Sequence, residues 1–88
     1  MFYTKEHLFA GAYEWTGLDG PTLFTGTPSR RTFDRYNGPQ VLFIINYFGE
    51  SVGKTTIADG RRTEELISMS LPLGVKSELS VMRWLKEC

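Results

Sequence analysis

Cysteine is nearly absent from this sequence, since Cys88 is the only one among 88 residues. A single cysteine allows neither a disulfide within the chain nor a cysteine-based metal site, which favours a reducing compartment such as the cytoplasm. Histidine is as scarce, with His7 alone, and the sequence contains no nucleophile-elbow motif. Because groups for covalent, acid–base and metal chemistry are so few, we expect a protein that is not an enzyme, with no catalytic residues, no metal site and no cofactor.

The sequence also lacks an excess of charge of either sign, because ten Lys and Arg balance ten Asp and Glu. Nucleic-acid-binding domains normally have a strongly basic composition or face, so nucleic acid is not the favoured partner. The longest uninterrupted apolar run is residues 41–45, far short of the ~20 residues that a membrane-spanning helix needs. The first residues lack the apolar core of a signal peptide. We therefore expect a soluble cytoplasmic protein that does not associate with membranes.

What the sequence has in quantity is aromatic residues, which make up 14% of the chain. Tyr and Trp are concentrated at protein interfaces, so some of them are candidates for contact residues. The length indicates one domain, residues 1–88, which buries roughly 60–65% of the surface that the unfolded chain exposes. The fold therefore has a single modest core.

Three apolar segments predict an antiparallel sheet. Residues 41–48 are apolar on both faces, as in a central strand that is covered on two sides. Residues 55–58 are largely β-branched and lead into Asp59-Gly60, a hairpin-turn signal. Residues 67–73 alternate strictly between apolar and polar residues, with Pro72 suited to a strand end or a sheet edge.

Two amphipathic segments at the ends of the chain predict helices. Residues 4–15 and 77–87 repeat apolar positions at helical spacing, and Ser77 is a good N-cap for the second. Residues 30–37 are ambiguous: Thr27 before a proline favours a helix, whereas an Asn-Gly pair ending at Gly38 favours a hairpin. We prefer the helix. The predicted fold is α+β, with a three- to four-stranded antiparallel sheet packed against an N-terminal and a C-terminal helix.

A loop and an arginine cluster predict a surface for a protein partner. Residues 16–29 hold three Gly and two Pro, and loops of this length are often functional. We expect Leu23 and Phe24, in a short strand within this loop, to be apolar anchors. Arg30, Arg31 and Arg35 follow, and on a helix the last two would share one face and orient an acidic partner. The favoured function is a small non-enzymatic protein-interaction module, such as an inhibitor or an accessory subunit.

A second motif nearly matches the phosphate-binding P-loop, G-x-x-x-x-G-K-[ST]. Gly53, Lys54 and Thr55 fit its last three positions, but only three residues separate Gly53 from Gly49. In the register of Lys54 the first glycine is replaced by Phe48, whose side chain would obstruct a phosphate. The interpretation we favour is a hairpin loop after the central strand. A small-molecule or nucleotide-binding protein, with a ligand at a homodimer interface, remains an alternative.

The sequence Leu-Gly-Val before an amphipathic helix that carries Val-x-Arg-Trp-Leu resembles the turn and recognition helix of a helix-turn-helix, over about 15 residues from residue 73. The resemblance implies a DNA-binding regulator with residues 77–87 as the recognition helix. The candidate DNA contacts are Lys76, Ser77 and Arg83. The spacing from turn glycine to valine is one residue longer than usual, and the preceding segment alternates like a strand.

Overall fold

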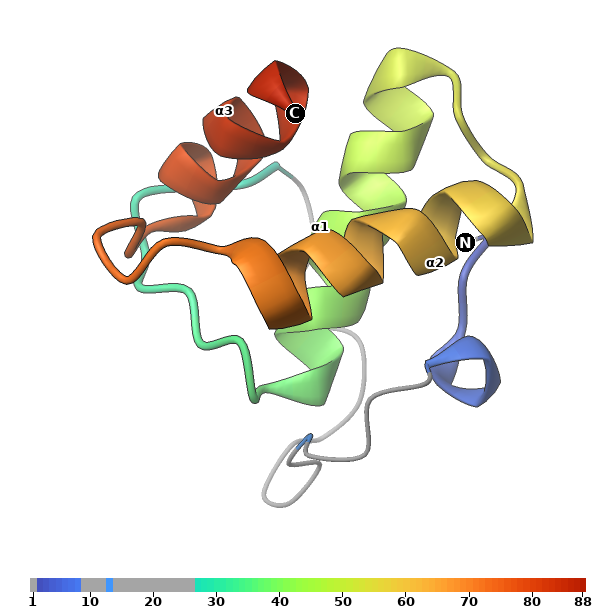
Figure 1. Ribbon diagram of the computed structural model, residues 1–88, viewed down its shortest axis with the longest axis horizontal. Coiled ribbons are helices and arrows are strands. Elements are labelled where there is room, and N and C mark those ends of the chain that lie inside the picture. The colour runs from blue at the N-terminus through green and yellow to red at the C-terminus, as the bar shows by residue number, and fades with distance from the viewer. Residues whose placement is uncertain (1, 9–12, 14–26) are drawn as a thin grey trace.

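The computed structural model describes residues 2–8, 13 and 27–88. Its elements, in chain order, are η1 (Lys5–His7), α1 (Gly38–Val52), α2 (Ile57–Glu65), η3 (Leu66–Ser70) and α3 (Glu78–Glu87) (Figure 1). The described part of the chain contains no strand, and the antiparallel bridge between Thr32 and Ser77 is isolated. The predicted α+β fold with an antiparallel sheet is therefore wrong, because the described domain is helical.

The segment predicted as the central strand, residues 41–48, lies within α1. The helix begins after Asn37, whose Oδ1 accepts a hydrogen bond from the Gln40 backbone N–H at 3.1 Å. It ends at Gly53, which has the left-handed φ of 75° that glycine adopts without strain. The residues at 41, 42, 44 and 45 are all buried. A continuous apolar run fits a helix surrounded by partners as well as a covered strand, and packing favoured the helix here.

The other two predicted strands are also helical. Thr56 and Asp59 form a reciprocal capping box at the start of α2, so residues 55–58 lead into a helix and the Asp-Gly pair is no hairpin turn. The predicted strand 67–73 is split between η3, a turn of π-helix, and the connection that follows. Its alternation does not define one face, since Leu71 is buried while Met69 is 72% exposed and Leu73 is 86% exposed.

The closing helix is confirmed. Ser77 is the N-cap of α3, and its Oγ accepts a hydrogen bond from the Ser80 backbone N–H at 3.2 Å. The inner face of the helix contributes three side chains to the core, from Val81, Met82 and Leu85.

Neither of the other two predicted helices is confirmed. The predicted helix over residues 4–15 lies mostly outside the described residues, and the described part contains only the short 3₁₀ turn η1. The prediction that residues 30–37 form a helix is wrong, because this segment is extended at Thr32 and turns at Arg35 and Tyr36.

The core forms around α1, which contacts both α2 and α3 (Figure 1). Apolar side chains from α1, η3 and α3 are joined there by Tyr3 and Phe33, both buried. This packing holds α3 and the connection before it on the left side of the molecule in Figure 1, away from the α1–α2 connection on the right. Among the described residues, no helix combines the length and the apolar character needed to cross a membrane.

Candidate functional site

Two helices joined by a turn make up the end of the chain. The helical segment formed by α2 and η3 ends at Ser70, and α3 begins at Glu78. Pro72, which the sequence analysis placed at a strand end or a sheet edge, lies in the connection, where its carbonyl accepts a hydrogen bond from the Val75 N–H at 3.1 Å. The connection is seven residues long, against the three or four of the simplest helix-turn-helix. Two helical segments therefore flank the connection, which is longer than that of a simple helix-turn-helix.

The outer face of α3 carries exposed side chains at helical spacing. Leu79, Arg83 and Lys86 lie at positions i, i+4 and i+7, and all three are exposed. Because the opposite face of α3 is buried against the core, the helix presents one face to solvent.

An extended segment, residues 29–35, lies beside the N-terminus of α3; we call it the strap. Backbone hydrogen bonds join the two: the Glu78 N–H donates to the Arg31 carbonyl and the Leu79 N–H donates to the Ser29 carbonyl, both at 3.1 Å. The Phe33 N–H donates to the Lys76 carbonyl at 2.8 Å. The strap thus satisfies N–H groups of the first turn of α3 that have no partner within the helix.

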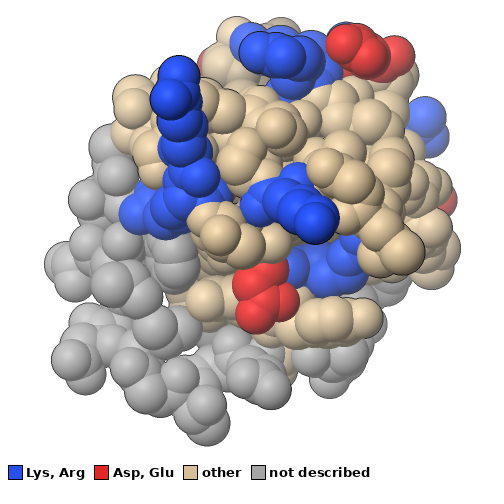
Figure 2. Space-filling model, turned by 90° about the vertical axis from the view of Figure 1, so that its left-hand side faces the viewer, with Lys and Arg blue, Asp and Glu red and all other residues tan. Residues whose placement is uncertain are grey.

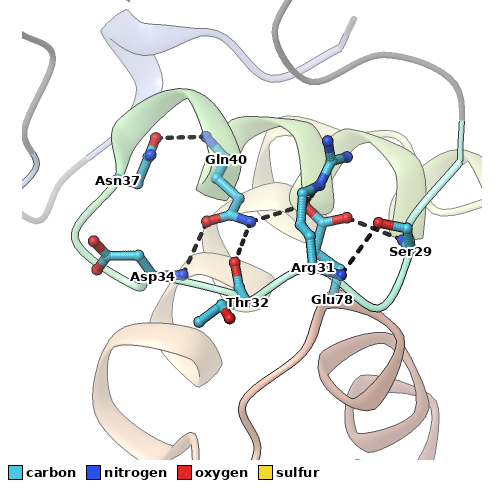
Figure 3. Close-up of polar contacts among 7 residues, drawn as sticks. All are labelled: Ser29, Arg31, Thr32, Asp34, Asn37, Gln40 and Glu78. Atoms are coloured by element: carbon cyan, nitrogen blue, oxygen red, sulfur yellow. Dashed lines mark hydrogen bonds and ion pairs between the residues drawn. The ribbon is translucent and has the colours of Figure 1, made fainter. Parts of the chain in front are cut away.

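A buried carboxylate fixes the strap further (Figure 3). Glu78 has no exposed surface, and its Oε1 accepts from the Ser29 N–H at 3.0 Å. Its Oε2 accepts from Arg31 Nε at 2.6 Å and from Gln40 Nε2 at 2.8 Å. A buried charge requires such partners, since an unpaired one costs several kcal/mol.

Gln40 extends this network from the first turn of α1. Its Oε1 accepts from the Asp34 N–H, and its Nε2 donates to the Thr32 carbonyl, both at 2.9 Å (Figure 3). The amide therefore ties the strap to α1, while Glu78 ties the strap to α3. The three segments form one hydrogen-bonded unit.

Basic residues are concentrated on this part of the molecule. The strap, the connection and α3 carry six of the ten Lys and Arg residues, namely Arg30, Arg31, Arg35, Lys76, Arg83 and Lys86. The same segments contain three acidic residues, of which Glu78 is buried. Figure 2 shows several Lys and Arg side chains on the face to which these segments contribute, with fewer Asp and Glu side chains among them. A chain without net charge therefore has a basic face.

A second buried cluster joins the N-terminal residues to α2. Glu64 has no exposed surface, and it accepts hydrogen bonds from the Tyr3 hydroxyl at 2.8 Å and the Tyr13 hydroxyl at 2.9 Å. The pKa of both tyrosines is raised. Burial is the largest cause, and the hydrogen bond to Glu64 and the charge of Glu64 add to it. Asn46 of α1 accepts from the Tyr3 N–H and donates to the Tyr3 carbonyl. Because Tyr3, Glu64 and Asn46 are buried, we interpret this cluster as a structural element that stabilises the fold.

The structure places three of the five predicted protein-binding residues but does not test whether they bind a partner. Leu23 and Phe24 lie outside the described residues. Arg30, Arg31 and Arg35 lie in the strap, where an extended backbone replaces the predicted helix, so the expected i, i+4 pair does not form. Arg31 instead binds Glu78, and Arg35 donates from Nη2 to the Leu71 carbonyl at 2.9 Å.

The other two predicted sites lie far apart. Gly53, Lys54 and Thr55 are exposed in the connection between α1 and α2, and a helix, not a strand, precedes them. The P-loop arrangement of strand, loop and helix is therefore incomplete. Lys76 and Arg83 are exposed on the basic face, with Ser77 between them as the N-cap of α3.

Sequence reasoning missed the two residues that organise the site, Gln40 and Glu78. The available signals were a polar residue directly before the apolar run 41–45 and an acidic residue directly after the N-cap Ser77. Among the described residues, no group of three or more His, Cys, Asp or Glu side chains is placed to hold a metal ion. Comparisons with protein-family models, with curated proteins and with solved structures found no match.

Proposed function

We propose that this protein is a DNA-binding regulator that uses α3 as its recognition helix. The observation that carries the proposal is the basic face, on which exposed cations of the strap, the connection and α3 gather although the chain has no net charge (Figure 2). Phosphates attract such a face, because binding releases the counterions condensed on the duplex. The single cysteine supports a cytoplasmic setting.

The dimensions of α3 fit duplex DNA. Its ten residues span ~15 Å, and the major groove of B-form DNA accepts an α-helix and displays base edges to it. Arg83, at the centre of the outer face, has the fork of donors that recognises guanine. The deep, narrow major groove of an RNA duplex excludes a helix, so DNA is the favoured partner.

Duplex binding, measured by fluorescence anisotropy between about 50 and 200 mM salt, tests the proposal. The wild type should bind at low salt and lose affinity steeply as salt rises, and Arg83→Ala should weaken binding. Lys54→Gln is the matched control, because Lys54 is exposed in the α1–α2 connection on the other side of the molecule. Absence of wild-type binding at the lowest salt would refute the proposal. A loss confined to Lys54→Gln would favour the phosphate site.

A second candidate function is the protein-interaction module, an inhibitor or accessory subunit. Exposed apolar side chains favour it, since Leu73 is 86% exposed and Leu79 is 44% exposed, and the exposed Lys76 lies between them in the sequence. An acidic partner with an apolar anchor would fit this combination. Affinity capture from nuclease-treated extracts should then retain one protein, and Leu73→Ser should release it while DNA binding is unchanged.

A further inference from the structure

The strap carries charge outside the recognition helix. We infer that it is a second DNA-contacting element, which binds the phosphate backbone beside the groove that α3 enters; this rests on the proposed function. An α-helix alone reads base edges, whereas contacts to phosphates set the register of a protein on the duplex. The structure holds such an element next to α3.

The two remaining arginines of the strap have different surroundings from Arg31. Arg30 is exposed, and its guanidinium makes no hydrogen bond or ion pair with any described residue. Arg35 is partly exposed and uses one nitrogen, Nη2, for the Leu71 carbonyl. Arg31, by contrast, holds the buried Glu78. Arg30 and Arg35 are therefore the donors that the strap offers to phosphate oxygens, and Arg31 is its anchor.

The strap is ordered before any ligand arrives. Its backbone forms hydrogen bonds with the first turn of α3. It also forms hydrogen bonds with the side chains of Gln40, from α1, and Glu78, from α3, so both helices hold it in place (Figure 3). A preorganised element loses little conformational entropy on binding, so its contacts contribute fully to affinity. Because α3 shares these bonds, the strap and the recognition helix approach the duplex as one body.

Phosphate contacts have a specific signature in the salt dependence of binding. Each one contributes about −0.9 to the slope of log K against log salt, and its loss weakens binding to all sequences equally. Arg30→Gln should therefore raise the Kd about 3- to 10-fold at low salt, flatten the slope by about 0.9, and do so alike on two unrelated duplexes. Exposure of Arg30 predicts an unchanged melting temperature, which circular dichroism checks.

The controls separate this inference from the proposed function. If the wild type does not bind duplex, both are overturned. If the wild type binds and Arg83→Ala weakens binding, but Arg30→Gln leaves both the Kd and the slope unchanged, only the strap is overturned. An equal change of slope in Lys54→Gln would also overturn it, because the effect would then reflect total charge and not the position of the strap. A change in Arg30→Gln alone supports it.

Discussion

Replacing Glu78 by Gln keeps the shape of the side chain and removes its charge, which tests the buried network directly. Glu78 accepts one hydrogen bond on Oε1 and two on Oε2. The amide of Gln retains one acceptor oxygen, so in either orientation its NH₂ group faces at least one N–H donor. A lost hydrogen bond to a charged group costs about 1.5–3 kcal/mol. The side chain of Arg31 is 37% exposed, so water can solvate its guanidinium when Glu78 loses its charge. The added free-energy cost of losing this ion pair is therefore small.

We therefore expect Glu78→Gln to lower the free energy of unfolding by about 2–4 kcal/mol, which for a domain of this size lowers the melting temperature by roughly 10–30 °C. Urea unfolding followed by circular dichroism measures the change. Glu87→Gln is the control, because Glu87 is exposed on the same helix and its loss should change stability by less than about 0.5 kcal/mol. If both variants unfold at the wild-type urea concentration, the network does not hold α3 and the strap in place.

Two further predictions concern the N-terminal residues. Gly60→Ala should destabilise the protein by about 1–3 kcal/mol in urea unfolding, despite the higher helix propensity of alanine, because its Cβ would overlap the Tyr3 ring. Gly74→Ala, with open space around the new Cβ, should be nearly neutral, and equal effects would contradict the packing. Since the pKa values of Tyr3 and Tyr13 are raised, the folded state holds these protons more tightly; the resulting stability is complete below pH about 10 and is lost as the pH rises further. Thermal melting at several alkaline pH values should show a smaller loss for the double Tyr→Phe variant than for the wild type, and parallel curves would refute this.

The helix at the end of the chain could be predicted from the sequence because its signals are local. Ser77 precedes a run of apolar residues at helical spacing, and both features act within a few residues. Thr56 and Asp59 form an equally local capping box, but Asp59 and Gly60 are also an Asp-Gly pair, which is typical of a hairpin turn. The strand predicted at 55–58 is the result.

For residues 41–48, local sequence signals do not decide between a strand and a helix. Val, Ile and Phe favour strands slightly, and the run is apolar on both faces. Whether such a segment is a covered strand or a central helix depends on what packs around it. Helices α2 and α3, which contact α1, decided it. The strict alternation of residues 67–73 misled for the same reason, because Met69 and Leu73 point to solvent.

By itself, the sequence determined the amphipathic helix α3 and its cap, the scarcity of catalytic groups, and the balance of charge, because these depend on composition and on neighbours along the chain. The basic face depends on the tertiary structure. Only folding brings the strap, which carries Arg30, beside the first turn of α3, through the backbone bonds at Ser29 and the buried carboxylate of Glu78. Charges that cancel over the whole chain are thereby separated in space, which no average over the sequence reveals.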